Sequence, residues 1–133
     1  MSISFPYEKK IIEEGELIDP RIPLQIKTPV GFLTIKFLLD SGADVTTLPF
    51  SPYAELFNFK RSQKEKVTIG GIEGGGVNGY PFSLTVRLAK HEFSLRCYFI
   101  ESRSDPLLGR LDFWNIFSIG FDNKNLKTVL TRF

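Results

Sequence analysis

The chain reads LTIKFLLDSG from Leu33 to Gly42, an apolar strand that ends in an aspartate, a serine and a glycine. Apolar residues occupy the odd positions, which is the pattern of a strand with one buried face. A carboxylate at the end of a buried strand is costly unless hydrogen bonds or a partner compensate it. Ser41 and Gly42 supply a hydroxyl and a backbone that can turn tightly. By itself such a triplet is a turn at least as often as a catalytic loop, so its surroundings decide the interpretation.

The composition is that of one ordinary soluble domain. The 133 residues are 42% hydrophobic and 24% charged, which is enough chain for a real hydrophobic core. The formal net charge of +2 is small and no block of Lys and Arg occurs, so we expect no nucleic-acid partner.

We expect neither a secretion signal nor a membrane-spanning segment in this sequence. The N-terminus lacks the apolar core of a secretion signal, and no apolar run approaches membrane-spanning length. The single cysteine, Cys97, excludes an intrachain disulfide and favours a reducing compartment. We therefore expect a cytoplasmic protein with no membrane partner.

Alternation with period two dominates the chain and predicts a mainly β protein. Turn residues at 28–31 join two alternating segments into a hairpin that leads into Asp40. The glycine-dense residues 70–79 predict either a floppy hairpin tip or a mobile flap that closes over a ligand. The expected strands are 21–27, 32–39, 67–69, 81–88, 93–100, 118–122 and 126–130.

Two short helices complete the expected fold. In residues 50–57, Ser51 is a candidate cap and Pro52 a candidate first helical residue. Residues 110–117 are apolar at helical spacing. Without a βαβ rhythm, the pattern predicts one mainly β domain over residues 21–133, with a closed or sandwiched sheet, after an N-terminal arm of residues 1–20.

Reactive residues are scarce, which excludes most catalytic chemistries. The chain has one histidine and one cysteine, too few to build a zinc site, and we expect neither a metal nor a cofactor. His91 and Cys97 lie roughly 20 Å apart if one strand carries both, so they cannot form a dyad within one subunit. We expect His91 in a solvated turn and Cys97 as a buried structural thiol.

Carboxylate chemistry at Asp40 remains. Hydrolysis of peptides by aspartates needs two carboxylates that share one proton, one to take a proton from water and one to protonate the carbonyl oxygen. The chain has one Asp-Ser-Gly triplet and is too short for two lobes. If Asp40 acts in this way, it must face the Asp40 of a second copy across a two-fold axis. The hypothesis therefore demands an obligate homodimer.

Three segments in one order resemble the retropepsins, the homodimeric aspartic proteases of retroviruses, retroelements and cellular retropepsin-like proteins. Residues 37–48 look like the active-site strand and loop, 68–75 like the flap tip, and 106–110 like the motif before the C-terminal helix. The resemblance implies a closed β-barrel with a flap hairpin and one short C-terminal helix. It also implies an aspartic endopeptidase that acts on peptide or protein substrates.

The resemblance assigns roles to individual residues. Asp40 would be the catalytic aspartate, Ser41 would hydrogen-bond across the dimer axis, and Gly42 would offer its carbonyl to the substrate. Asp44 would bind substrate backbone and pair with Arg110, which would tether the loop. The remaining expected residues are Gly70, Gly71 and Ile72 in the flap, Leu38, Ala43, Val45 and Leu108 around the substrate, and Gly109 as structural support.

The sequence departs from the family pattern in its flap and termini. Glu73 stands where small residues are usual, and residues 76–79 extend the flap. The N-terminal arm gives no clear strand for a terminal dimer sheet, so we expect an interface built mainly from the C-terminal strands. A catalytically silent dimer of the same fold, acting as a peptide-binding or dimerisation module, remains open because it would keep the same strand-pairing groove.

Overall fold

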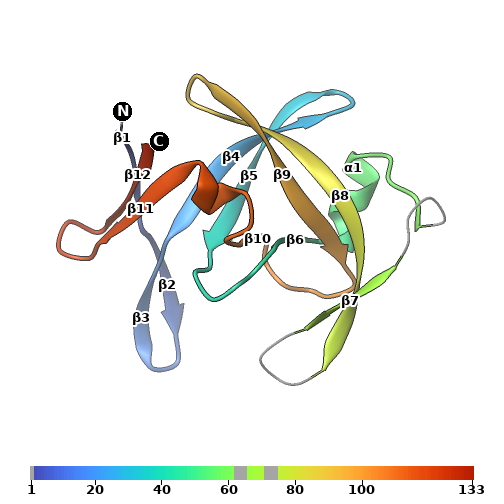
Figure 1. The fold of residues 1–133 in the computed structure, drawn as a ribbon. Coiled ribbons are helices and arrows are strands. Elements are labelled where there is room, and N and C mark those ends of the chain that lie inside the picture. The colour runs from blue at the N-terminus through green and yellow to red at the C-terminus, as the bar shows by residue number, and fades with distance from the viewer. Residues whose placement is uncertain (1, 62–65, 71–74) are drawn as a thin grey trace.

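The computed structural model describes residues 2–61, 66–70 and 75–133. A seven-stranded sheet forms the body of the molecule, in the order β4-β5-β10-β6-β9-β8-β7. An additional pairing of β4 with β8 closes the strands into a ring, as Figure 1 shows. The strands are β4 (Arg21–Thr28), β5 (Gly31–Leu39), β6 (Thr46–Pro49), β7 (Val67–Gly70), β8 (Gly76–Leu88), β9 (His91–Ile100) and β10 (Leu107–Leu108).

A second sheet joins the two ends of the chain. It has the order β1-β12-β11, with β1 at Ser2–Pro6, β11 at Phe117–Asp122 and β12 at Lys127–Arg132. The N-terminal arm thus contributes a strand that the sequence did not reveal. Ile3 and Phe5 are its only inward-facing side chains, and they pack partly buried against the core.

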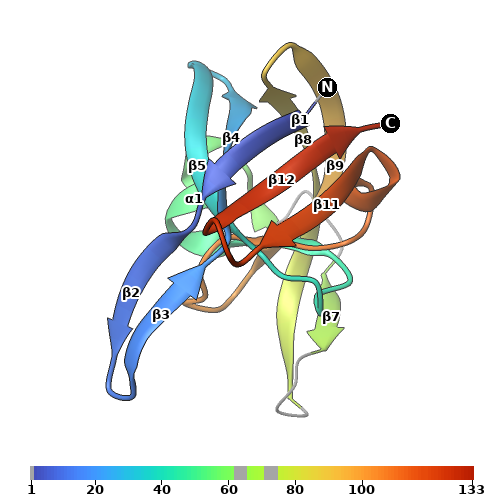
Figure 2. The same cartoon turned by 90° about the vertical axis from the view of Figure 1, so that its left-hand side faces the viewer.

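A third, two-stranded sheet is made of β2 (Glu8–Ile12) and β3 (Gly15–Asp19). Within the described residues these two strands pair only with each other. Figure 2 shows the hairpin extending away from the body of the molecule. Strand β3 continues directly into β4, so the base of the hairpin is fixed to the ring.

Helical structure is sparse. Helix α1 spans Phe50–Leu56, but Ser51 does not cap it, because Ser51 itself has extended dihedral angles and no side-chain cap bond is present. The helical segment expected over residues 110–117 is reduced to a 3₁₀ turn, η2, at Phe113–Asn115. No helix in the described part of the chain is long and apolar enough to cross a membrane.

A tight turn at Asp112 explains why the C-terminal helix is so short. Asp112 has φ 68° and ψ −48°, and the N–H of Phe113 donates to the carbonyl of Leu111 at 2.8 Å, which is the geometry of a γ-turn. The Arg96 side chain and backbone N–H donate three hydrogen bonds to the Asp112 carboxylate, at 2.8 to 3.1 Å. These bonds lower the pKa of Asp112 and hold the turn in place.

The core fills the ring with large apolar side chains. Cys97 is 1% exposed, and burial raises the pKa of its thiol, so the prediction of a buried structural cysteine is confirmed.

His91 begins β9, and its Nε2 atom is buried, so the prediction of a solvated turn histidine is wrong. The largest fully buried side chains are Phe37, Phe99, Phe113, Phe117, Ile22, Leu24, Ile26, Leu48, Leu84, Leu95, Leu108 and Leu130.

A matched pair of leucines tests this core. Leu48 is 0% exposed in β6 and Leu56 is 40% exposed in α1. We expect Leu48→Ala to lower the free energy of unfolding by about 2–5 kcal/mol, because it leaves a cavity in the ring. Leu56→Ala should cost about 1 kcal/mol or less, since its side chain is largely in water. Urea unfolding at one protein concentration compares them, and equal losses would contradict the assigned core.

Candidate active site

Asp40 lies in a tight loop directly after β5. Its backbone N–H donates to the carbonyl of Leu108 at 3.1 Å, and its carbonyl accepts the N–H of Ala43 at 3.1 Å. Its Oδ1 atom accepts the N–H of Gly42 at 2.9 Å, and the residue is half-buried. One oxygen of the carboxylate is therefore fixed by its own loop, which sets the direction of the side chain.

The segment after β10 holds the other side of the loop. The N–H of Arg110 donates to the carbonyl of Ala43 at 3.0 Å, and the N–H of Leu111 donates to that of Asp44 at 2.9 Å. The Arg110 guanidinium also pairs with the Asp44 carboxylate, the pair that the family resemblance implied. These side chains are 47% and 83% exposed, so solvent screening limits the pair to about 0–1 kcal/mol.

Gly109 crosses the loop at a distance that only glycine allows. A Cβ atom at this position would lie 2.3 Å from the carbonyl oxygen of Val45 and 2.8 Å from its nitrogen. The N–H of Gly109 donates to Oγ1 of the fully buried Thr46 at 3.1 Å. The two backbones therefore touch directly at Gly109.

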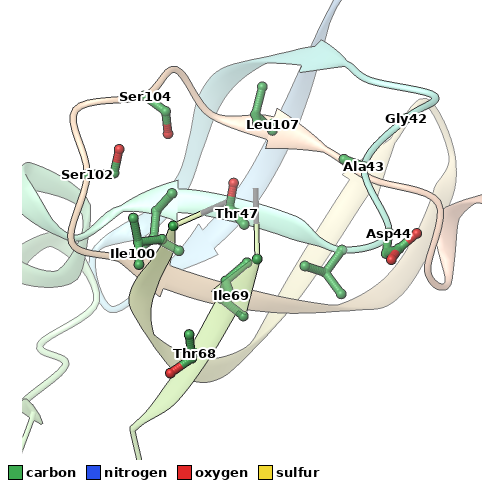
Figure 3. Close-up of a pocket in the computed structure, with 14 residues that line it drawn as sticks. Gly42, Ala43, Asp44, Thr47, Thr68, Ile69, Ile100, Ser102, Ser104 and Leu107 are labelled. Carbon is green, nitrogen blue, oxygen red and sulfur yellow. The ribbon is translucent and has the colours of Figure 1, made fainter. Parts of the chain in front are cut away.

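A cavity of about 690 Å³ opens between the Asp40 loop and the strands of the flap hairpin. One wall is the segment from Gly42 to Val45, and the opposite wall comes from β7 and the start of β8. Figure 3 shows Thr47 at the centre of this cleft, between Leu107 of β10 and Ile69 of β7. The cleft thus has a loop along one side and strands along the other.

The structure brings many of the predicted residues to this cleft. Gly42, Ala43, Asp44, Val45 and Gly70 line it, while Asp40 and Ser41 directly precede the lining segment. The predictions for Gly71 and Ile72 fall outside the described residues.

Two predicted leucines are placed differently. Leu108 is fully buried in the core, and its neighbour Leu107 lines the cleft. Strand β10 pairs Leu107 with Leu38 and Leu108 with Leu39, so each pair shares one face of the sheet. Leu38 is half-buried on the face of Leu107 but is not part of the lining.

Sequence reasoning missed several residues of the far wall. They lie in β6, in β7, at the start of β8 and just before it, at the end of β9, in the segment that follows β9, and in β10, where no local motif marks them. The only sequence signal that could have indicated them is the alternation of side chains along β6 and β7. In the described parts of the chain, no group of three or more His, Cys, Asp and Glu side chains is placed to hold a metal ion. The missed residues are Thr47, Thr68, Ile69, Gly75, Val77, Ile100, Ser102, Ser104 and Leu107.

Gly109→Ala tests the crossing of the two backbones. We expect a loss of at least about 3 kcal/mol in the free energy of unfolding, because the new methyl group would meet backbone that cannot rotate away. Gly120→Ala is the control, since a Cβ there would lie 3.9 Å from the Val129 carbonyl oxygen, an ordinary contact. Thermal unfolding of both variants decides, and a Gly109→Ala protein as stable as the control would refute the clash.

Two adjacent threonines give a second test of the loop. Thr46→Val removes the acceptor of the Gly109 N–H, so we expect a loss of about 1–3 kcal/mol in the free energy of unfolding. The Oγ1 of Thr47 is buried and has no hydrogen-bond partner among the described residues. Thr47→Val should therefore be neutral or stabilising. Urea unfolding at matched protein concentration measures both, and similar losses for the two variants would contradict this assignment.

The comparisons with known proteins agree with this geometry. No family model and no curated protein matches the chain. Among solved structures, a retropepsin-like aspartic protease from Rickettsia conorii aligns with TM-score 0.66 and 19% identity, over 98% of this chain and 89% of that one. EIAV protease, in complex with the inhibitor HBY-793, aligns with TM-score 0.53 and 24% identity, over 69% of this chain and 82% of that one. The chain therefore has the fold of the retropepsin-like aspartic proteases, as the sequence motifs predicted.

Proposed function

We propose that this chain is an aspartic endopeptidase that works as a homodimer, with one Asp40 from each subunit. The observation that carries the proposal is the placement of Asp40 on a loop fixed by the segment from Leu108 to Leu111, beside an open cleft. The sequence has a single Asp-Ser-Gly triplet, so one chain supplies only half of the required pair of carboxylates. The fold shared with aspartic proteases supports this assignment.

In the proposed reaction the two carboxylates hold one proton between them. The ionised carboxylate accepts a proton from a water molecule, whose oxygen attacks the carbonyl carbon of the peptide. The protonated carboxylate donates its proton to the carbonyl oxygen, which gives a tetrahedral diol. Collapse of the diol breaks the C–N bond and transfers a proton to the leaving amine, so the pair again holds one proton.

The loop geometry supports this role of Asp40. The Gly42 N–H donates to Oδ1 at 2.9 Å and so holds one oxygen of the carboxylate against its own loop. The orientation is thus set before a second subunit binds. Preorganised groups of this kind contribute to catalysis because they need no rearrangement during the reaction.

The cleft fits an extended peptide. Ala43, Asp44 and Gly70 place backbone on both sides of the cavity, where a peptide strand can form main-chain hydrogen bonds. The lining also carries aliphatic side chains, among them Ile69 and Leu107. We therefore expect substrates with apolar side chains near the cleaved bond.

Asp40→Asn is the direct test of the proposal. The wild type and the variant are incubated with a diverse peptide mixture at tens of micromolar (roughly) protein, from pH 3 to 8, and cuts are mapped by mass spectrometry. We expect the variant to lose all cuts, because an amide can neither accept the proton of water nor share one. Glu55→Gln, an exposed acid-to-amide change on α1, should cut like the wild type.

Dimerisation and pH dependence complete this experiment. We expect dimers of wild type and Asp40→Asn alike in sedimentation equilibrium, and cleavage that is best on the acidic side of neutral, since the pair must keep one proton. Cuts that persist in Asp40→Asn, or rates that rise steadily above pH 8, would refute the shared-proton mechanism. A folded wild-type dimer that binds peptides without cutting them would instead identify a catalytically silent binding module.

A further inference from the structure

The β2–β3 hairpin leaves an unusual amount of apolar surface in water. Ile11 is 86% exposed, and Ile12, Leu17 and Ile18 are 36%, 42% and 38% exposed. Clusters of exposed aliphatic side chains are uncommon on monomers and mark interaction sites. A two-stranded hairpin without further packing is also only marginally stable in water. The hairpin therefore exposes apolar surface that a partner could bury, and it would be more stable if a partner covered it.

Both faces of the hairpin carry exposed aliphatic side chains among charged ones. The register pairs Ile11 with Glu16 and Lys9 with Ile18, so Ile11 and Ile18 lie on one face. Ile12 and Leu17 lie on the other, because successive side chains alternate between the faces. A hairpin that rests on its own body needs only one apolar face. Two such faces indicate an element that is covered from more than one side.

The base of the hairpin is held rigidly next to Asp40. The Arg21 guanidinium contacts the carboxylates of Asp19 and Asp105, each at 3.0 Å, and Lys36 pairs with Glu8 at 3.0 Å.

The backbone reinforces this attachment. The N–H of Leu39 donates to the carbonyl of Pro20 at 2.9 Å, which ties the residue before Asp40 to the residue after β3. The base of the hairpin is therefore attached directly beside the Asp40 loop.

We propose that the β2–β3 hairpin is a dimerisation arm that packs against a second copy of this chain, beside the paired Asp40 loops. In Figures 1 and 2 the hairpin and the flap strands extend toward the same end of the molecule, and in Figure 1 the loop after β5 lies between them. A subunit that brings its own Asp40 to this loop must approach that end. The inference rests on the proposed function, which makes the site incomplete without the second copy.

The test replaces one aliphatic side chain on each face, in the variant Ile11→Ser with Leu17→Ser. We expect the dimer dissociation constant from sedimentation equilibrium to rise at least about tenfold, because the two substitutions remove apolar side chains that the partner would bury. The control is Val30→Ser, which alters a 96% exposed valine in the β4–β5 turn and should leave the constant unchanged. A folded double variant that dimerises like the wild type would overturn the proposal.

Hydrogen exchange on the wild type tests the arm without any substitution. Between protein concentrations that give mainly monomer and mainly dimer, amide protection in residues 8–19 should increase at least about tenfold, because the partner covers a marginal hairpin. Protection that is independent of concentration, in a sample whose dimer fraction changes, would also overturn the proposal. This measurement decides even if the double variant does not fold.

The arm and the protease assignment fail in distinguishable ways. If the double variant weakens the dimer while the wild type shows no Asp40-dependent cuts, the arm stands and the enzyme does not. If such cuts are present but the dissociation constant of the double variant is unchanged, the protease assignment is supported and the dimerisation arm is refuted. If both hold, cleavage by the double variant falls at low concentration and returns as the protein is concentrated, by mass action.

Discussion

The contact between the backbones of Gly109 and Val45 is the constraint on which the site depends. Without a side chain at residue 109, β10 can enter between β5 and β6, where it pairs in parallel with one and antiparallel with the other. This insertion links β5 to β6 and brings the carbonyl of Leu108 to the N–H of Asp40. The position of the Asp40 loop is thus determined by a segment from much later in the chain.

The clamp on the loop consists mainly of backbone hydrogen bonds. Arg110 and Leu111 donate to the carbonyls of Ala43 and Asp44, and these bonds do not depend on which side chains are present. The Asp44–Arg110 ion pair lies largely in water and adds little to the stability of the free chain. Of the two side chains, Asp44 lines the cleft, where the proposed function would bring it close to a substrate.

Local signals in the sequence predicted the parts of the fold that local chemistry determines. The hairpin before Asp40 follows from alternation and turn residues. The flap was predicted only in part, because β7 pairs with residues 76–79, which the sequence analysis assigned to the glycine-dense tip rather than to a strand. The failures are non-local. Strand β1 has only two inward side chains and gains its partner from the end of the chain, and the turn at Asp112 needs Arg96 from β9. Similarly, a two-residue strand has no period, so only its neighbours decide whether Leu107 or Leu108 faces the cleft.

Under the proposed function, three features of the chain are incomplete in one subunit, and a second copy would complete all three. A single Asp40 carboxylate has no second carboxylate with which to share a proton, and the open cleft has one Asp40 loop beside it. In addition, the β2–β3 hairpin exposes aliphatic side chains on both faces. Each feature has a separate explanation as a surface turn, a shallow groove or a loose arm. However, they lie around one loop and at one end of the fold, where a two-fold axis would bring the same surfaces together. A single symmetric contact is therefore the simpler account, because it satisfies the chemistry of Asp40 and the burial of the hairpin at the same interface.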